Sequence, residues 1–259
     1  MRINETNRVG RPAEYRPTAH ADISSQEPRD HYQPSGTAYS DPMRDLAKAQ
    51  GAARAAALPS QRAMDAAKRM GLSFGPDGKP KPLTRDEMRK LAESLDKLPP
   101  KLLAQLEKEG VKIELHDKMP EGSAPKAEGQ YFPENKRIKL LRGGLEAVPT
   151  PPGKTNVLLH ELGHAVDDML VKGDTSDKVT RYTDSREFIR DFTNHGFQVE
   201  GIGQPAHPEK KLTDYSLTNQ REYFSEGFRM YLQSPETRAQ LQQRDPKLFQ
   251  RLQSILGPG

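Results

Sequence analysis

Two histidines stand four residues apart in the stretch NVLLHELGHAVDDML, which covers positions 156 to 170. In an α-helix this spacing points His160 and His164 to the same face, about 6 Å apart along the axis. Two imidazole nitrogens placed in this way can bind one metal ion at about 2.0 Å each, a distance typical of zinc. The spacing therefore predicts a metal site on a helix.

Glu161 adds an acid–base group to this helix. It follows His160 by about 100° around the axis, at the edge of the same face. A zinc ion with three protein ligands lowers the pKa of a water molecule that it binds toward about 7 and polarises a carbonyl group. Glu161 can take the proton of that water and pass it to a leaving amine. The pattern His-Glu-x-x-His is therefore typical of zinc-dependent peptide hydrolysis.

The rest of the helix favours a metal site over a chance match. Gly163 is a poor helix former and leaves room beside the histidines. The side of the helix opposite the histidines is apolar, which predicts that it packs into a core. Its residues are Leu158, Leu162, Ala165, Val166 and Met169.

A third ligand is expected from a glutamate or histidine on a later element. Glu222 and Glu226 again stand four apart, so one carboxylate could bind the metal while the other accepts the free N–H of a ligand histidine. A solvated, charged helix face explains the same spacing equally well. The spacing alone therefore leaves several candidates open: His195, His207, Glu187, Glu200, Glu222 and Glu226.

The elements that must position these residues begin, by prediction, at Thr84. The sequence TRDE gives a capping box of Thr84 and Glu87 before apolar residues at helical spacing. A second short helix should end at Gly110. Three short strands are then expected, with turn residues between the last two: 111–115, 129–132 and 137–141.

Helices dominate the remainder of the chain. The histidine pair lies in a helix expected from Lys154 to Val171, and a further helix starts near Ser185. Asn219 caps another helix, and two more begin with a cap residue followed by proline. A small mixed sheet beside a mainly helical C-terminal part predicts an α+β fold.

Residues 1–83 differ in composition from the rest of the chain. Positions 1–40 mix polar residues and proline without helical or strand periodicity, which predicts disorder. Alanine-rich residues 41–71 favour one or two weak helices that need a partner to become stable. We therefore predict a largely disordered N-terminal segment, 1–83, before a folded domain, 84–259.

Charge and composition exclude several classes of protein. Residues 1–83 carry 13 Lys and Arg against 9 Asp and Glu, which leaves 27 of each sign in residues 84–259 out of totals of 40 and 36. The neutral balance of residues 84–259 argues against a nucleic-acid-binding domain, because such a surface normally needs a clustered excess of basic residues. The chain has no cysteine, so disulfides and thiolate metal ligands are excluded. No apolar run approaches the roughly 18 residues that cross a bilayer, and the N-terminus lacks the apolar stretch of a secretory signal peptide.

Two blocks of the sequence together resemble a known family. HELGHAVDD, followed by TDYSLTNQREYFSEGFRMYL, is similar to the active-site segments of the lethal-factor-like zinc metallopeptidases, which include the Pro-Pro endopeptidases. The similarity runs from about Val157 to Tyr231 and more weakly to the C-terminus. The connection between His164 and Tyr215 looks longer than in the family, and residues 1–83 match nothing in it.

The resemblance implies a zincin-like fold with one Zn²⁺ per chain. Carried over residue by residue, it implies that His160, His164 and Glu222 bind the zinc ion. Glu161 would then be the general base. The family activity that follows is hydrolysis of a peptide bond by a metal-activated water.

Three further residues are candidates for supporting roles, and for Tyr215 and Glu226 the resemblance implies the role. The hydroxyl of Tyr215 would stabilise the oxyanion or protonate the leaving amine. Glu226 would support a ligand histidine through its ring N–H. Asp168, beside Asp167, is a candidate to support His164 or the end of the helix, and a solvated acidic pair is the alternative.

The resemblance further implies an endopeptidase acting on an extended peptide, including a proline-containing host protein. The substrate strand would pair with an edge strand, for which 137–141 is the candidate. A cysteine-free chain with a polar start suits a bacterial toxin or effector, secreted by a type III-like route or translocated into a host cell. Residues 41–71 would then bind an export chaperone. A cytoplasmic peptidase with a disordered tail would look the same.

Two interpretations of another class compete with this one. The domain could bind peptides without cutting them, which the presence of Glu161 and Tyr215 disfavours. Alternatively, residues 1–83 could be the functional module that binds an acidic partner or a membrane surface. Glu161→Ala tests the first, since an enzyme should lose cleavage and keep its metal. Deletion of residues 1–83 tests the second, since activity on a small peptide should survive.

Overall fold

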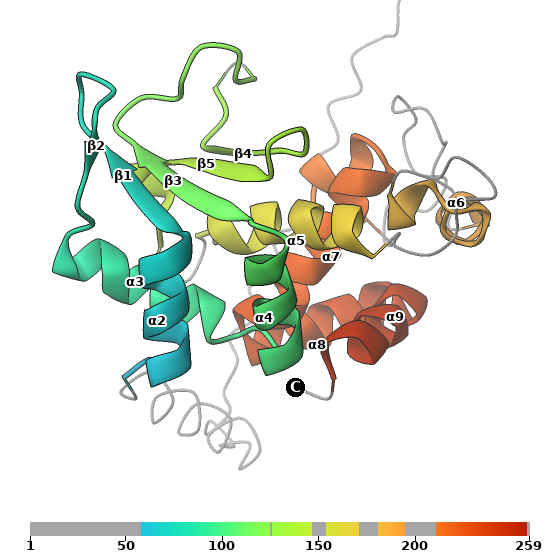
Figure 1. Cartoon of the computed structure of the whole chain (residues 1–259). Coiled ribbons are helices and arrows are strands. Elements are labelled where there is room, and N and C mark those ends of the chain that lie inside the picture. Colours follow the sequence, from blue (N-terminus) through green and yellow to red (C-terminus); the bar gives the residue numbers. More distant parts are fainter. Residues whose placement is uncertain (1–57, 125, 147–153, 171–180, 195–210, 258–259) are drawn as a thin grey trace, which may run out of the picture. The chain divides into compact units, whose positions relative to one another are not determined.

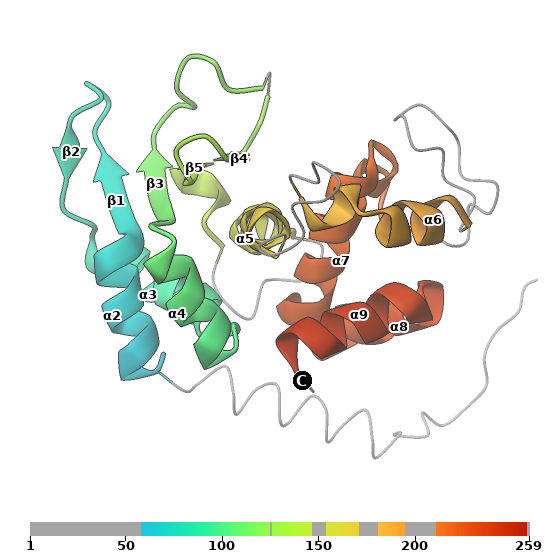
Figure 2. The same ribbon diagram turned by 45° about the vertical axis from the view of Figure 1, so that its right-hand side comes forward.

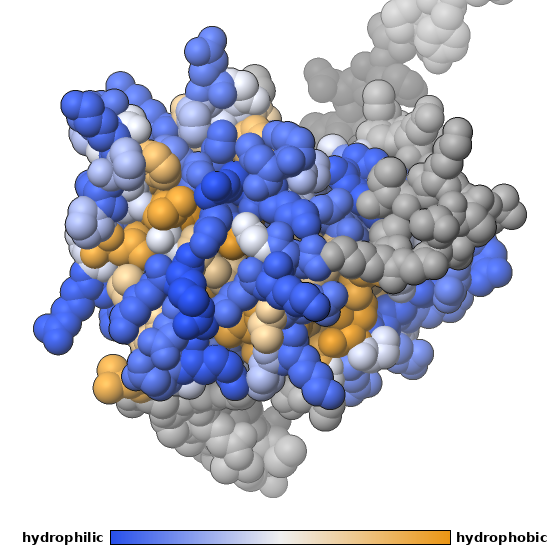
Figure 3. Space-filling view, in the orientation of Figure 1, coloured by the Kyte–Doolittle hydropathy of each residue, from blue (hydrophilic) through white to orange (hydrophobic). Residues whose placement is uncertain are grey.

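The computed structural model of the chain describes residues 58–124, 126–146, 154–170, 181–194 and 211–257 (Figure 1). These residues form a mixed sheet, helices that precede or connect its strands, and a set of helices toward the C-terminus. The predicted α+β class is therefore confirmed. The face seen in Figure 3 is mainly hydrophilic, with hydrophobic residues exposed in separate areas. Every helix in the described ranges is too short or too polar to span a bilayer.

The sheet of the described residues has five strands in the order β2–β1–β3–β5–β4. The central strands β1, β3 and β5 run parallel, and β2 and β4 pair antiparallel with their neighbours at the two edges. Ile113 and Leu115 of β3 lie opposite Ile138 and Leu140 of β5, and all four are buried. The bounds are β1 Gly71–Phe74, β2 Pro80–Lys81, β3 Lys112–His116, β4 Gly129–Phe132 and β5 Arg137–Leu141.

The prediction that residues 137–141 form the edge strand is wrong. β5 lies between β3 and β4, and β4 is the edge strand on that side. β5 places Ile138 and Leu140 in the core, whereas β4 buries only Tyr131. The strand with two core side chains takes the central place because it is the one that gains from neighbours on both edges.

The folded domain begins before the predicted boundary at Thr84. Helix α2, Gln61–Met70, packs on helices α3, Arg85–Leu95, and α4, Pro100–Lys108. β1 follows α2 directly and pairs in parallel with β3. Residues from Ser60 onward therefore belong to the same core as the rest, which corrects the predicted division at residue 83. Residues 1–57, where disorder and a further weak helix are predicted, lie outside the described residues.

The reason for this error lies in the side chains of α2. Its buried positions are Ala63, Ala66, Ala67 and Met70, so three of the four are alanines. Small side chains bury little area each, but they let two helices approach closely and exclude water. The capping box of Thr84 and Glu87 at the start of α3 is confirmed.

The C-terminal part is helical, as predicted. Figure 2 looks along α5, which lies between the sheet and α7. Side chains of Asn156, Asn219, Ser234 and Asp245 cap helices in this region. The helices are α5 Val157–Met169, α6 Arg186–Asn194, α7 Gln220–Gln233, α8 Pro235–Arg244 and α9 Pro246–Leu256.

Gly163 sets how closely α5 and α7 approach. A Cβ atom on Gly163 would lie 2.8 Å from Cα of Ser225 on α7. That distance is shorter than carbon atoms tolerate, so any larger residue would push the two helices apart. The sequence pattern assigned this glycine to the space beside the histidines. The structure assigns it to the contact with the helix that carries Glu222.

Candidate metal centre

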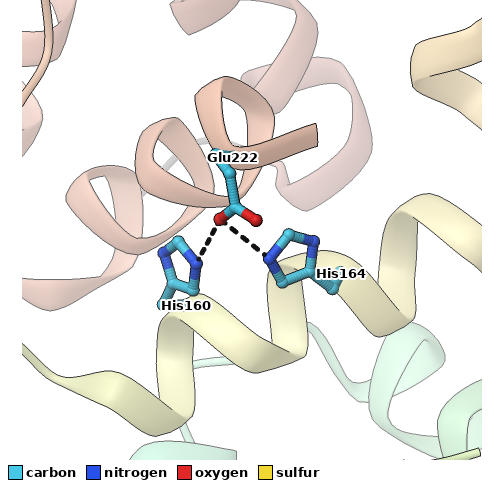
Figure 4. A group of neighbouring side chains, drawn as sticks. All are labelled: His160, His164 and Glu222. Carbon is cyan, nitrogen blue, oxygen red and sulfur yellow. Dashed lines mark hydrogen bonds and ion pairs between the residues drawn. The ribbon is translucent and has the colours of Figure 1, made fainter. Parts of the chain in front are cut away.

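Two imidazoles and one carboxylate converge where α5 meets α7 (Figure 4). Nε2 of His160 lies 3.0 Å from Oε2 of Glu222, and Nε2 of His164 lies 3.1 Å from the same oxygen. The three donor atoms fall within 4.8 Å of one another. The fold thus brings Glu222 to the histidine pair although it follows His160 by 62 positions.

Asparagine caps fix the first turns of both helices. Oδ1 of Asn156 accepts a hydrogen bond from the N–H of Leu159 at 3.0 Å. Oδ1 of Asn219 accepts from the N–H groups of Arg221 and Glu222, at 2.9 and 3.0 Å. Such caps satisfy backbone donors that the first turn leaves unpaired. The Asn219 cap therefore holds the backbone of the predicted ligand Glu222 directly.

The donor set fits a zinc ion. Zinc binds histidine nitrogen at about 2.0–2.1 Å and prefers tetrahedral geometry, which separates neighbouring donor atoms by about 3.3 Å. The two nitrogen-to-oxygen distances of 3.0 and 3.1 Å are close to that separation. Three protein ligands also leave the fourth position open, as in catalytic zinc sites.

A second carboxylate, Glu226, holds the other side of the His160 ring. Its Oε1 lies 2.8 Å from Nδ1 of His160, and both residues are buried. A carboxylate that accepts the Nδ1 proton fixes the tautomer and directs Nε2 toward a metal. Glu226 therefore lies where a supporting carboxylate is expected.

Arg229 connects Glu226 to the start of α5. Its guanidinium donates to both carboxylate oxygens of Glu226, at 3.1 and 3.0 Å, and to Oε1 of Gln233 at 2.7 Å. Gln233 accepts from the backbone N–H of Asn156 at 3.3 Å and donates to the carbonyl of Lys154 at 3.1 Å. Buried polar groups thus link His160 to the cap of its own helix. Arg229 was not among the predicted residues, although its place one helical turn after Glu226 was an available signal.

Glu161 is buried against the edge strand β4. A Cβ on Gly129 would lie 2.6 Å from Cγ1 of Val157 and 3.1 Å from Cγ of Glu161, so glycine is required for this close approach. The backbone of Tyr131 donates a hydrogen bond to the Glu161 carboxylate. Burial raises the pKa of Glu161 despite the nearby histidines. A raised pKa suits a group that accepts and then returns a proton.

A cavity of about 250 Å³ opens beside these residues. Glu161, His164 and Glu222 form part of its wall, so the cluster of predicted ligands faces a space that can hold part of a substrate. The edge strand β4 contributes another part. The remaining lining residues are Ala124, Ala127, Gly129, Gln130, Tyr131, Arg181, Tyr215, Asn219 and Arg221.

Tyr215 lies in a short 3-10 turn, Tyr215–Leu217, just before α7. The centroid of its ring is 5.6 Å from that of His160, and 57% of the residue is exposed. Burial of its hydroxyl, followed by the negative charge of Glu222, raises the pKa of Tyr215 to about 12. The hydroxyl therefore stays protonated at neutral pH and can donate a hydrogen bond into the cavity.

The ligand cluster carries strong opposing charges without metal. Burial lowers the pKa of His160, but hydrogen bonds to Glu222 and Glu226 outweigh burial and raise it to about 10. Burial likewise raises the pKa of Glu222, but hydrogen bonds from His160 and His164 outweigh that effect and lower it to about 2. In the absence of metal, a proton on His160 therefore takes the place of the positive ion between the two carboxylates.

The metal-free protein should become less stable as the pH rises above neutral. An unfolded histidine releases its proton near pH 6.5, whereas folded His160 keeps it up to about pH 10. The stabilisation is therefore complete below pH 6.5 and is lost toward pH 10, by up to about 1.4 kcal/mol per pH unit. Thermal unfolding of EDTA-treated protein at about pH 6, 7.5 and 9 measures this.

Unfolding of the zinc-loaded protein at the same pH values is the control for this pH dependence. Zinc binds deprotonated imidazole, so the increase in unfolding temperature on adding zinc should grow with pH over the same range. A metal-free protein whose unfolding temperature does not change between pH 6.5 and 9 would contradict the protonation of His160.

The other predicted residues have different partners. Asp168 accepts a hydrogen bond from the hydroxyl of Tyr131 at 2.9 Å. Asp167 accepts from the backbone N–H and the hydroxyl of Thr183, each at 2.8 Å. Both aspartates thus tie α5 to neighbouring segments, and Asp168 holds a tyrosine of the cavity wall.

Among the remaining candidates for the third ligand, Glu187 lies on α6 and pairs with Arg251 at 2.8 Å. That ion pair does not include any of the three clustered donors. His195, Glu200 and His207 lie outside the described residues.

A family model and a curated protein match parts of the chain. The family model described as "Anthrax toxin lethal factor, N- and C-terminal domain" matches residues 150–255. Lethal factor of Bacillus anthracis is 34% identical over 128 residues, which cover 48% of this chain and 14% of that protein. The chain thus spans a small part of this relative's length. The resemblance predicted from the two sequence blocks is confirmed.

A solved structure is also similar to this chain. The PRO-PRO endopeptidase PPEP-2 from Paenibacillus alvei has a TM-score of 0.49 and 20% sequence identity. The superposition covers 76% of this chain and 100% of that chain.

Proposed function

Because residues 150–255 match the family model of anthrax toxin lethal factor, we propose that this protein is a zinc-dependent endopeptidase. One observation supports the proposal most: His160, His164 and Glu222 converge, and two of them, His164 and Glu222, line one cavity together with the buried Glu161. The substrate would be an extended segment of a protein, and each chain would hold one Zn²⁺.

The proposed chemistry assigns one task to each group. Zinc held by the three ligands would polarise the scissile carbonyl and make a water molecule more acidic. Glu161 accepts the proton of the attacking water and delivers it to the leaving amine, for which its raised pKa is suited. Tyr215 donates a hydrogen bond to the oxygen on which negative charge develops. Glu226 keeps the His160 ring in one orientation.

The edge strand β4 is the proposed docking strand for the substrate. Its residues Gly129, Gln130 and Tyr131 line the same cavity as Glu161 and His164. An extended peptide that pairs with the outer edge of β4 would place a carbonyl group near the metal ligands. Proline-containing peptides are the first substrates to test, because the family includes the Pro-Pro endopeptidases.

Metal analysis of a ligand variant tests the proposed function. We expect wild-type protein to retain about one zinc per chain, and Glu222→Ala to bind zinc about a hundredfold more weakly or worse. Competition with a fluorescent chelator measures both affinities. Glu236→Ala is the matched control, because Glu236 is an exposed glutamate in the first turn of the next helix.

A peptide-library screen with the zinc-loaded wild type then measures cleavage. Zinc-loaded protein that cuts no peptide, or a Glu222→Ala variant with unchanged zinc affinity, would count against the peptidase.

We also propose that the protein acts after export from the producing cell, as a toxin or effector. The similarity to lethal factor of Bacillus anthracis supports this proposal. Fusion of residues 1–40 to a reporter tests the proposed signal-independent route. A reporter that remains inside secretion-competent cells would refute an export signal in that segment.

A further inference from the structure

Two arginines line the cavity that holds the catalytic groups. Arg181 and Arg221 share its wall with His164, Glu161 and Glu222. Neither arginine has a task in the proposed chemistry. Their charge therefore calls for a separate explanation.

Asp184, which is not a lining residue of the cavity, holds the side chain of Arg221. Its Nη2 lies 3.4 Å from Oδ1 of Asp184, an oxygen that also accepts from Nε2 of Gln220 at 3.4 Å. The side chain is 41% exposed. Its Nε is buried and finds no hydrogen-bond partner in the described part of the chain. The guanidinium is thus anchored at one end and keeps donors to spare.

The position of Arg221 in α7 costs stability. It occupies the second residue of the helix, where the N-terminal end of the helix dipole is positive and disfavours a cation. A negatively charged residue would suit this place better. A nearby anion would offset this small penalty, and Asp184 supplies one through a single long contact.

Arg181 adds a second positive charge from a different segment. It lies just before the turn Tyr182–Asp184 and is partly exposed in the cavity wall. Within the described ranges its guanidinium has neither an ion pair nor a hydrogen bond. Its charge acts on Asp167 through space, but no described hydrogen bond or ion pair holds the guanidinium away from a ligand in the cavity.

The acidic residues of the cavity wall do not cancel these two arginines. Glu222 is occupied by the two histidines, and Glu161 is buried against β4. With a divalent ion bound to the predicted ligands, the wall would carry an excess of positive charge. Partly buried cavities of one sign attract ligands of the opposite sign, because low-dielectric walls concentrate the field.

We propose that Arg181 and Arg221 form a subsite for a carboxylate of the substrate, namely an aspartate or glutamate side chain close to the scissile bond. The inference rests on the proposed peptidase function and adds its substrate class. Guanidinium groups bind carboxylates through paired hydrogen bonds, which gives position as well as attraction. A residue with a neutral or positive side chain at the same position would leave both guanidinium groups without an anion.

Peptide binding tests this subsite without cleavage. The probe is a set of peptides with blocked ends, in which one glutamate is moved through the positions on both sides of the central bond. Each peptide is compared with its glutamine counterpart by fluorescence anisotropy on the full chain carrying Glu161→Gln. At the best position, glutamate should bind about tenfold more tightly than glutamine.

Variants of the two arginines test whether these side chains cause the preference for glutamate over glutamine. We expect Arg181→Gln and Arg221→Gln, each added to Glu161→Gln, to lower the ratio of the affinity for the glutamate peptide to that for the glutamine peptide severalfold. Arg62→Gln is a matched control, because Arg62 is also the second residue of a helix, follows a glutamine and pairs with one aspartate, Asp96, at 3.7 Å. It is 46% exposed and lies on α2, so the control should leave the ratio unchanged.

A third set of peptides identifies the source of the carboxylate. These peptides contain glutamine but end in a free carboxylate, so tighter binding of this set alone would assign the subsite to a chain end rather than a side chain. Salt supplies a measurement without arginine variants, in case they do not fold. The ratio of the affinity for the glutamate peptide to that for the glutamine peptide should approach one as the ionic strength rises to about 0.5 M.

The outcomes separate the two proposals. Equal binding of glutamate and glutamine peptides would overturn the subsite even if the wild type cleaves peptides. So would an Arg62→Gln variant that loses as much of the preference for glutamate as the Arg181 and Arg221 variants do. A preference that depends on Arg181 and Arg221 in a protein that binds no zinc would support the subsite and overturn the peptidase.

Discussion

Replacing Glu161 with glutamine should lower kcat/KM for a cleaved peptide by about a thousandfold, because the amide cannot accept the proton of the attacking water. The substitution keeps the shape of the side chain, so the close contact with Gly129 is preserved. Glu161 is not one of the three clustered donors, and zinc affinity should therefore change little. Steady-state kinetics and chelator competition on the same preparation measure both effects.

The pair of measurements makes this prediction specific. A variant that loses zinc together with activity would assign Glu161 a structural role at the metal centre. A variant that retains more than about a tenth of wild-type kcat/KM would exclude it as the general base.

Replacing Arg229 with methionine should destabilise the metal-free protein by about 3–5 kcal/mol. The guanidinium is the partner of the buried Glu226 carboxylate and also donates to Gln233. Its removal leaves a negative charge in the interior with only His160 to compensate it, and breaking a buried ion pair has a cost of this size. Urea-induced unfolding of EDTA-treated protein measures the change.

A double variant and a surface control sharpen this result. Adding Glu226→Gln to Arg229→Met removes the unpaired charge and should restore part of the stability. Arg62→Met, which breaks an exposed ion pair, should change stability by about 1 kcal/mol or less. Zinc affinity of Arg229→Met should fall about tenfold or more, because the His160 ring loses its fixed support. If the free energy of unfolding of Arg229→Met lies within about 1 kcal/mol of the wild-type value, the buried Glu226 carboxylate does not need Arg229 as its partner.

The shared face of the histidine pair in the candidate metal centre could be predicted from sequence because it is encoded at short range. The four-residue spacing of His160 and His164 fixes one face of a helix, and the apolar residues around them fix how that helix packs. Glu222 was one of six later glutamates and histidines that were candidates for the third ligand, and only the family resemblance distinguished it. Its position depends on the contact between Gly163 and α7, which arises only in the folded chain.

The parts that could not be predicted depend on long-range pairing. The sequence of residues 137–141 does not indicate whether that strand pairs with one neighbouring strand or with two. The edge strand was wrongly assigned for this reason. The buried link through Arg229 and Gln233 joins residues that are far apart in sequence to the start of α5. Arg181 and Arg221 had no visible connection until the fold placed both beside the same cavity.

Strand β1 determines where the chain can be shortened. A protein cut at residue 83 would lack the parallel neighbour of β3, and the exposed edge of that strand, with Ile113 and Leu115 beside it, would invite aggregation. Loss of activity in such a truncated protein would reflect a broken sheet and would give no information about residues 1–57. A dissection that asks what the N-terminal region contributes must therefore start the shortened chain ahead of Ser60, whose side chain caps α2.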